Sequence, residues 1–400
     1  MKFRKLTPEV IKDKVVIIRV DFNVPLKDGK VMDTTRIEES IPTLKFILEN
    51  NPKELHILTH AGRPKGQVVP EVSTAHLIPD TEKYLGEKIE FRPDYSKGTS
   101  KIQLHENCRF YPGEKKNDPA LGQEIFDNIQ PDIFIIDGFA VCHRAQASVI
   151  GLEGKVPCYP GFLIEKEIEA LSPFLTDKKL PGLTILIGGL KMETKVPVLR
   201  HFAKVAENIL VGGGLANTFQ VAKGVSIGES LYEEEELAAA KEVMDIAKAN
   251  NTNFLLPEDT ICAGDIESTD TEEVAIGEVT GNKKIFDIGS QTINHYAEVL
   301  KNSSTVIWNG PMGVLEKEQF ANGTKEMLMT IKDLKSAKTI LGGGDTLKSL
   351  KKWNISKSEF SHVSTGGGAM LEFLAGNELP GFKILEEGLY YNIITKVCLR

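Results

Sequence analysis

Five glycine-rich stretches in the second half of the sequence are of a type that binds anions. They read "IGGLK" (187–191), "VGGGLA" (211–216), "WNGPMG" (308–313), "LGGGDT" (341–346) and "STGGGA" (364–369). A glycine-rich turn that opens a helix exposes backbone N–H donors and the positive end of the helix dipole. One such turn often serves packing alone, but five in one half of a chain indicate a site for phosphate groups. None reads GxxxxGK[ST] or GxGxxG, so neither a P-loop nor a dinucleotide fold is indicated.

Charged and hydroxyl side chains accompany these turns. Asp345 is well placed to hold Mg²⁺, which takes carboxylate and phosphate oxygens, although it could instead be a plain helix N-cap. Thr346 could cap the helix or bind a phosphate. Lys191 and Lys195 would share a face if their segment is helical, and two ammonium groups there repel unless an anion lies between them. A solvated lysine pair is the alternative.

Cationic side chains mark the first half of the chain instead. Four arginines and two histidines fall in or after loops that follow apolar runs: Arg36, Arg63, Arg109, Arg144, His60 and His143. Arginine suits a two-pronged grip on phosphate or carboxylate. Each one alone could be a surface residue, but four at equivalent positions indicate a small, highly charged anionic substrate. The sequence shows no Ser–His–Asp or Cys–His arrangement and no His/Cys spacing typical of a metal site.

The elements that must position these residues are short apolar strands that alternate with helical segments. Strands are predicted at 15–20, 55–59, 101–104 and 132–137, and then at 183–187, 208–211, 253–256, 304–308, 338–341 and 361–364. Continuous apolar strands separated by helices predict an α/β fold with two similar-sized, Rossmann-like lobes, each a parallel sheet with helices on both faces. Ligands bind at the carboxyl ends of such strands. We therefore expect an Arg- and His-lined site on the first lobe and a site of backbone N–H groups on the second.

One amphipathic helix is predicted to join the two lobes as a hinge. Within 161–175, Ile164, Ile168, Leu171 and Leu175 recur at helical spacing. A helix is a stiffer connector than a Gly/Ser linker, which suits a hinge.

Composition limits the class of protein. The 400 residues suggest two or three domains, and the net charge of −8 makes bulk attraction to nucleic acid or an anionic membrane unexpected. The acidic run 233–236 is expected on the solvated face of the helix that follows it. Five cysteines without a CxxC pair, and no apolar run of membrane-spanning length, favour a cytoplasmic protein. The glycine-rich turns of the second half and the cationic loops of the first half together predict a two-lobed phosphoryl-transfer enzyme. Phosphoryl transfer depends mostly on positioning and charge neutralisation, which such groups can supply.

Several stretches closely resemble phosphoglycerate kinases, in order, over about residues 7–387. They include "RVDFNVPLKDGKV", "HAGRPKG", "ENCRFYPGEKKNDP", "HRAQAS", "VGGGLANTF", "TVIWNGPMGVLE", "LGGGDT" and "STGGGAMLEFLAGNELPG". The resemblance implies reversible transfer of the acyl phosphate of 1,3-bisphosphoglycerate to Mg-ADP, which gives 3-phosphoglycerate and ATP. It also implies a monomer whose lobes close, with a 3-phosphoglycerate domain over 1–162, a Mg-nucleotide domain over 163–375, and a segment 376–400 that returns to the first domain.

The resemblance also assigns roles to residues of this chain. The 3-phosphoglycerate end would be bound by Asp21, Asn23, Arg36, His60, Arg63, Arg109 and Arg144. Arg36 and Lys195 would neutralise the phosphoryl group in transit, Gly366 and Gly367 would donate N–H groups to it, and Lys191 would hold nucleotide phosphate. The nucleotide pocket would be shaped by Gly213, Gly289, Asn309, Pro311 and Glu316, with phosphate and metal carried by Gly343, Gly344, Asp345 and Thr346.

The sequence departs mildly from the family pattern. "THAGRP" stands for the usual "SHLGRP", "IDGFAVCHRAQAS" for "NDAFGTAHRAHAS", and "GGLKMETK" for "GGAKVSDK", with Leu190 and Met192 bulkier than usual and Thr194 where Asp is common. The tail "LYYNIITKVCLR" is expected to pack on the first lobe or to be an interaction segment. Two other functions remain open: a non-catalytic paralogue that binds nucleotide or phosphoglycerate, and a kinase for another small carboxylate.

Overall fold

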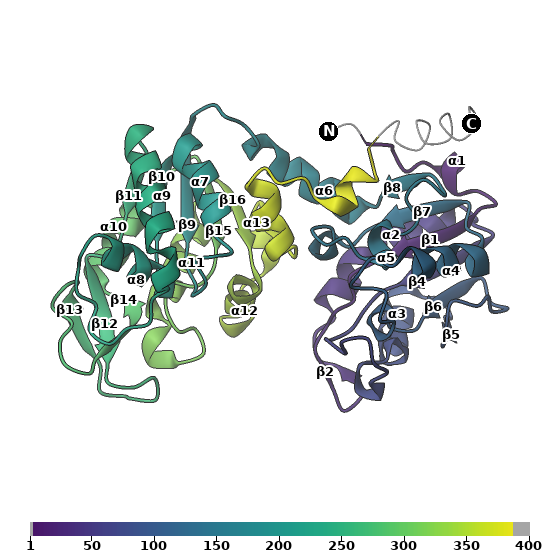
Figure 1. Cartoon of the computed structure of the whole chain (residues 1–400), viewed down its shortest axis with the longest axis horizontal. Helices are drawn as coiled ribbons and strands as arrows, with labels where there is room; N and C mark the ends of the chain where they lie inside the picture. Colours follow the sequence, from purple (N-terminus) through teal and green to yellow (C-terminus); the bar gives the residue numbers. More distant parts are fainter. Residues whose placement is uncertain (1–2, 387–400) are drawn as a thin grey trace. The chain divides into compact units, whose positions relative to one another are not determined.

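The structure, a computed structural model, describes residues 3–386. The chain divides into two compact units (Figure 1). Unit 1 holds the residues up to Glu169 together with those from Glu378 onward, and unit 2 holds Ala170–Asn377. No helix in the described part is long and apolar enough to cross a membrane.

Unit 1 is built on a six-stranded parallel sheet with the order β5-β6-β4-β1-β7-β8. Its strands are β1 (Val15–Arg19), β4 (Glu54–Leu58), β5 (Glu90–Arg92), β6 (Ile102–His105), β7 (Ile133–Ile136) and β8 (Cys158–Pro160), beside a hairpin of β2 (Leu26–Lys27) and β3 (Lys30–Val31). Its helices are α1 (Pro8–Ile11), α2 (Thr35–Glu49), α3 (Ile78–Leu85), α4 (Pro119–Ile129), α5 (Ala147–Ile150) and α14 (Pro380–Lys383).

Burial of the sheet on both faces explains the continuous apolar runs. All five residues of the central strand β1 are buried. Val16 and Ile18 pack in one core with Ile37 and Leu44 of α2. Burying each such side chain stabilises the fold by about 1.5–3 kcal/mol.

Unit 2 has a second six-stranded parallel sheet with the order β11-β10-β9-β15-β16-β17. Its strands are β9 (Leu180–Ile187), β10 (Ala206–Val211), β11 (Asn253–Leu255), β15 (Thr305–Asn309), β16 (Lys338–Gly342) and β17 (His362–Ser364). Its helices are α7 (Val196–Val205), α8 (Gly213–Ala222), α9 (Leu237–Ala249), α10 (Ser290–Lys301), α11 (Asn322–Asp333), α12 (Gly344–Lys352) and α13 (Gly368–Leu374). The prediction of an α/β fold with two parallel sheets is confirmed.

Unit 2 also contains a small antiparallel sheet that was not predicted from the sequence. It has the order β13-β12-β14 and consists of β12 (Asp259–Ala263), β13 (Glu272–Ala275) and β14 (Lys284–Ile288). Strands β13 and β14 are only partly buried and carry charged residues, so they lack the continuous apolar signal of the parallel strands.

The predicted joining helix is present as α6 (Phe162–Leu171). It is shorter than the predicted 161–175, because Pro173 cannot continue an α-helix and a 3-10 turn takes over at Ser172–Phe174. The division between the units falls near its end, between Glu169 and Ala170.

The segment after Glu378 packs on unit 1. The Phe382 ring lies 5.9 Å from that of Phe3 and 5.7 Å from that of Phe139. The N–H of Gly381 donates to the carbonyl of Cys142 at 2.9 Å, and a Cβ at this glycine would lie 2.9 Å from the Cys142 Cα. The tail from residue 387, including the stretch predicted to pack or to interact, lies outside the described residues.

Candidate active site

Asp21 and Arg36 meet at the carboxyl end of β1. The guanidinium of Arg36, in the first turn of α2, forms an ion pair with the carboxylate of Asp21. The Asp21 side chain is 7% exposed and that of Arg36 is 31% exposed. His60 follows the neighbouring strand β4 and is almost fully buried, with its Nδ1 3.8 Å from Asp21 Oδ1. Parallel pairing of β1 and β4 explains why these separate loops share one edge of the sheet.

Gly62 joins two further candidate residues. Its N–H donates to Asn23 Oδ1 at 2.9 Å, and its carbonyl accepts from Arg109 Nη1 at 2.9 Å. The glycine has φ +62°, and a Cβ there would lie 2.9 Å from the Val72 side chain. A glycine is therefore required at the point that holds Asn23 and Arg109 together.

Arg63 and Arg144 are exposed. Within residues 3–386, Arg63 forms no hydrogen bond or ion pair, so its guanidinium is available to a ligand. Arg144 Nε donates to His143 Nε2 at 3.0 Å. Unit 1 thus offers two arginines tethered to the fold, Arg36 and Arg109, and two that extend toward solvent.

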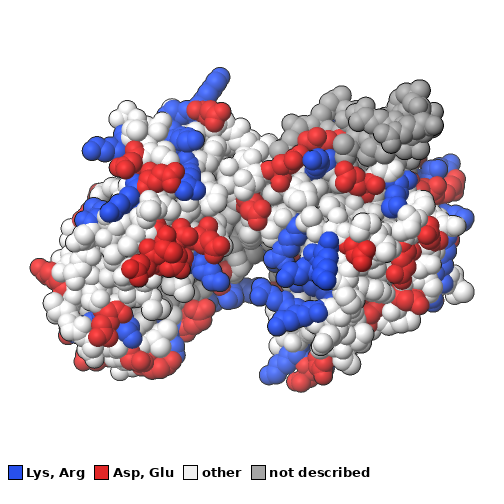
Figure 2. Space-filling model, in the orientation of Figure 1, with Lys and Arg blue, Asp and Glu red and all other residues white. Residues whose placement is uncertain are grey.

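Electrostatics keeps His60 and His143 neutral and leaves the positive charge on arginine. Burial, followed by the charges of Arg19, Arg109, Arg36 and Arg144, holds the pKa of His60 well below its usual range. Burial likewise lowers the pKa of His143 to about 4. Figure 2 shows Lys and Arg side chains gathered on the visible face of unit 1. The loops therefore form a cationic surface suited to a multiply charged anion.

Arg19 belongs to this group but was not among the sequence candidates. It is the last residue of β1 and is completely buried. An arginine inside the apolar run "VVIIRV" was the available signal, because a buried charge requires partners.

In unit 2, three glycine-rich loops interlock at the carboxyl ends of the strands. The N–H of Gly189 donates to Pro311 O at 2.8 Å, that of Gly213 to Met312 O at 2.8 Å, and that of Leu215 to Gly189 O at 2.9 Å. Gly213 has φ +62°, and a Cβ there would lie 2.7 Å from the Gly189 nitrogen. The glycines permit the backbones to approach so closely that the loops fix one another.

Three of the five glycine-rich turns open a helix directly, as predicted for phosphate cradles. Gly212, Gly343 and Gly367 are the N-caps of α8, α12 and α13. Gly343 has φ +99° and Gly367 has φ +52°, and a Cβ at Gly344 or Gly367 would meet no atom within 4 Å. The N-termini of α12 and α13 are thus free of covering side chains.

Asp345 and Thr346 lie in the first turn of α12. The N-cap alternative for Asp345 is wrong, because Gly343 occupies that position and no side chain caps the helix. The Asp345 carboxylate is 54% exposed and pairs with Lys348 Nζ at 2.7 Å. Thr346 is fully buried, and its hydroxyl accepts from the N–H of Gly310 at 2.8 Å. Asp345 is therefore accessible to a ligand, whereas Thr346 ties α12 to the loop after β15.

The segment with Lys191 and Lys195 is not helical, so the condition under which the two lysines would share a helical face is not met. Residues 190–195 form bends and turns, and α7 begins only at Val196. The Glu233 carboxylate accepts from the N–H of Met192 at 2.9 Å and holds this turn. The acidic run was expected on a solvated helix face, and Glu233 departs from that expectation.

The two lysines differ in environment. Lys191 is exposed, whereas Lys195 is 8% exposed and its ammonium lies beside Gly189. Burial lowers the pKa of Lys195, while the charges of Asp345 and Glu233 act in the opposite direction. Lys195 is thus a desolvated cation next to the glycine loops, where its attraction to an anion is strengthened.

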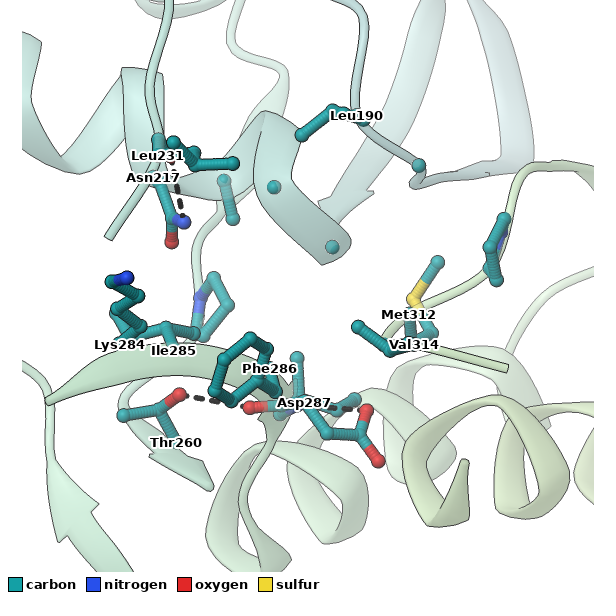
Figure 3. Close-up of a pocket in the computed structure, with 18 of the residues that line it drawn as sticks. Leu190, Asn217, Leu231, Thr260, Lys284, Ile285, Phe286, Asp287, Met312 and Val314 are labelled. Carbon is teal, nitrogen blue, oxygen red and sulfur yellow. Dashed lines mark hydrogen bonds between the residues drawn. The ribbon is translucent and has the colours of Figure 1, made fainter. Parts of the chain in front are cut away.

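A largely apolar pocket of about 480 Å³ lies beside these loops (Figure 3). Asn217 and Leu231 lie on one side, and Phe286 and Lys284 of β14 lie on the other. Four predicted nucleotide residues line it: Gly213, Pro311, Glu316 and Asp345. The β12–β14 sheet, which the sequence did not predict, therefore supplies one wall of the pocket.

The other predicted nucleotide residues stand outside the pocket lining. Gly289 leaves room for the Asp259 carboxylate, which accepts from the N–H groups of Gln291 and Thr292 at the start of α10. Asn309 lies against Gly343, where a Cβ would come within 2.9 Å of its amide. These residues support neighbouring backbone.

Known proteins resemble this chain over nearly its whole length. The family model described as phosphoglycerate kinase matches residues 7–377. The chain belongs to the phosphoglycerate kinase family. The solved phosphoglycerate kinase from Coxiella burnetii is 38% identical, with a TM-score of 0.84, over 96% of this chain and 98% of that one. The phosphoglycerate kinase from Pyrococcus horikoshii OT3 is 30% identical, with a TM-score of 0.80 and the same coverage.

Family membership gives the reaction class. Phosphoglycerate kinases are phosphotransferases with a carboxyl group as acceptor; they work in glycolysis and bind ATP. The carboxyl ends of the two parallel sheets carry arginine side chains in unit 1 and glycine-rich loops in unit 2.

Proposed function

We propose that unit 1 binds 3-phosphoglycerate or 1,3-bisphosphoglycerate and that unit 2 binds ADP or ATP. The observation that carries this assignment is the positive charge of the arginines around the buried, neutral His60. A small ligand with phosphate and carboxylate groups would balance that charge. The apolar pocket of unit 2 adjoins glycine loops, so it suits a ligand with an apolar ring at one end and phosphates at the other.

The transfer itself requires little of the protein beyond charge and position. When 3-phosphoglycerate is phosphorylated, its carboxylate oxygen attacks the γ-phosphorus of ATP, and the bond from that phosphorus to the β–γ bridging oxygen breaks. A carboxylate is already ionised at pH 7, so no general base is needed. Arg36 and Lys195 would neutralise the transferring group, and Lys191 would hold nucleotide phosphate. Gly367 would donate its N–H to the group, and so would Gly366, whose N–H donates to Ser364 Oγ at 3.1 Å in this structure and would have to leave it.

Asp345 would hold Mg²⁺ together with nucleotide phosphates. No group of three or more His, Cys, Asp or Glu side chains that could hold a metal ion occurs among residues 3–386. That fits Mg²⁺, which usually takes one or two carboxylates plus substrate phosphates rather than an all-protein cage. The carboxylate of Asp345 is exposed at the open N-terminus of α12, as such binding needs. The ion would neutralise phosphate charge.

Catalysis would require the two ligand-bearing units to close on each other. We propose that the enzyme works as a monomer and in the cytoplasm. Closure would expel water and so prevent hydrolysis of the acyl phosphate. The proposed domains are 1–162 for phosphoglycerate and 163–375 for Mg-nucleotide.

A coupled assay with 3-phosphoglycerate and Mg-ATP tests this function. We expect turnover that needs both substrates and the metal. No turnover, with ADP binding still measurable by titration calorimetry, would favour a non-catalytic binding protein. The altered loop 136–146 motivates a second alternative, a kinase for another small carboxylate. Faster turnover of such a carboxylate than of 3-phosphoglycerate would establish it.

A further inference from the structure

A chain of buried hydrogen bonds in unit 1 leads from Glu114 through Ser148 and Arg19 to His60. Arg19 Nε donates to Ser148 Oγ at 2.9 Å, and Arg19 Nη1 donates to the carbonyl of Val20. Arg19 Nη2 lies 3.1 Å from His60 Nδ1. The arginine is fully buried, so it reaches a ligand only through the groups that it orients.

Glu114 and Ser148 fix the direction of this chain. The Glu114 carboxylate, 1% exposed, accepts from the Ser148 N–H at 2.8 Å and from its hydroxyl at 2.5 Å. Since the Ser148 hydroxyl donates its proton to Glu114, the Ser148 oxygen is left to accept from Arg19 Nε. The carboxylate also compensates the buried guanidinium charge, which would otherwise be costly.

The contact between Arg19 and His60 determines where the imidazole proton lies. A guanidinium has only donors, so His60 Nδ1 must accept. The other group near Nδ1, Asp21 Oδ1, is 3.8 Å away, too far for a hydrogen bond. A neutral imidazole has one N–H, which must then be on Nε2. Within the described part of the chain, Nε2 of His60 has no hydrogen-bond partner.

We propose that Arg19 is a positioning residue that holds His60 as the Nε2–H tautomer, so that His60 offers a donor to the anionic ligand of unit 1. This inference rests on the proposed function for the identity of that ligand. The Nδ1–H tautomer would turn a lone pair toward the anion, and repulsion would replace a hydrogen bond. Since burial and the nearby arginines keep the ring neutral, its tautomer decides its usefulness.

The tautomer can be observed directly in the ligand-free protein. Two-bond ¹H–¹⁵N correlation spectra of the histidine rings at pH 7, with His60→Gln to assign the signals, should show a protonated Nε2 and an unprotonated Nδ1. A protonated Nδ1 or an imidazolium at His60 would overturn the proposal. This measurement needs no substrate, so it stands apart from the proposed function. If 3-phosphoglycerate fails to bind although the Nε2–H signal is present, the ligand assignment fails and the tautomer stands.

A double-mutant cycle then tests the link to binding. Arg19→Lys keeps the charge, but one ammonium cannot reproduce the guanidinium's fixed donors to both Ser148 and His60. We expect it to give a mixture of tautomers and to raise the KM for 3-phosphoglycerate about tenfold, with the KM for nucleotide unchanged. In the His60→Gln background, Arg19→Lys should have almost no further effect on that KM. An equal loss in both backgrounds would mean that Arg19 acts only through the fold.

Ser148→Ala supplies a second variant in case Arg19→Lys fails to fold. It removes the acceptor of Arg19 Nε but leaves the guanidinium and His60 in place. We expect a smaller rise in the same KM, about threefold, with part of the His60 signal shifted to the Nδ1–H form. An unchanged His60 signal together with a raised KM would contradict a role through the tautomer.

Discussion

The hydroxyl of Thr346 accepts a hydrogen bond of 2.8 Å from the backbone N–H of Gly310. The bond joins the first turn of α12 to the loop after β15, and both groups are buried. Thr346 therefore holds two glycine-rich segments in register, and we expect it to influence nucleotide binding through them.

Thr346→Val should disrupt this register while preserving side-chain volume. It leaves the Gly310 N–H unpaired, which costs about 1–3 kcal/mol of unfolding free energy. Thr346→Ser is the matched control, since it keeps the acceptor and loses only a methyl group, worth about 0.8 kcal/mol. Urea unfolding and ADP titration should show Val weakening nucleotide binding and Ser leaving it near wild type. Equal nucleotide affinities in the two variants would show that the bond does not position the site.

Arg36→Ala should lower turnover by a factor on the order of 10³, as loss of other charge-neutralising arginines does in phosphoryl transfer. The change also removes the ion-pair partner of the buried Asp21 carboxylate. We expect the loss mainly in kcat in the coupled assay. Arg200→Ala is the control, because its guanidinium binds Glu242 at the surface of unit 2. Turnover within tenfold of wild type would remove Arg36 from the mechanism.

Asp345→Asn should weaken binding of Mg-ADP about tenfold, or ~1.4 kcal/mol, and leave the affinity for 3-phosphoglycerate unchanged. Lys348→Met is the matched control, since it removes the partner of this carboxylate but keeps the carboxylate. Calorimetric titrations of ADP with and without Mg²⁺ separate the metal-dependent part. If Asn weakens both ligands equally, Asp345 is a structural residue.

The parallel sheets could be predicted because burial on both faces leaves an uninterrupted apolar run. All ten predicted strands occur in the structure. The edge strands β5 and β8 were missed: β5 is only partly buried and carries two charged residues, and β8 ends in a proline, so neither gives an apolar run. The antiparallel strands β13 and β14 escaped for another reason: their partly exposed residues include several charges, although Phe286 of β14 lines the pocket.

Single residues were predictable where their type implied the chemistry, as for the arginines and glycines of the loops. Residues that act through tertiary contacts were not. Glu233 reads as one acid in a run of four, and only the fold shows that it holds the turn at Met192. Arg19 reads as part of a strand, and its hydrogen bond to His60 joins two residues that lie 41 positions apart in the sequence. Spacing along the chain carries no record of such contacts.

The acid stability of the protein should depend on His105, at the end of β6. Its Nδ1 donates to the carbonyl of Asp94 at 2.7 Å, and its Nε2 lies 2.9 Å from His56 Nδ1. Burial lowers the pKa of His105 to about 3, against about 6.5 in an unfolded chain. Between these values the unfolded state binds more protons, so the stabilisation is complete above pH 6.5 and is lost as the pH falls toward 3.

His105→Gln should therefore flatten the decline of stability with acidification. The protonation of His105 on unfolding alone predicts that the free energy of unfolding falls by about 2 kcal/mol between pH 7 and pH 5. The variant should not show this fall. Other groups titrate in the same range, so the difference between the urea-unfolding free energies of variant and wild type is the measured quantity. His295→Gln is the control, because solvent already reaches that side chain, 40% exposed. If His105→Gln and His295→Gln decline in parallel with the wild type, protonation of His105 does not limit stability in acid.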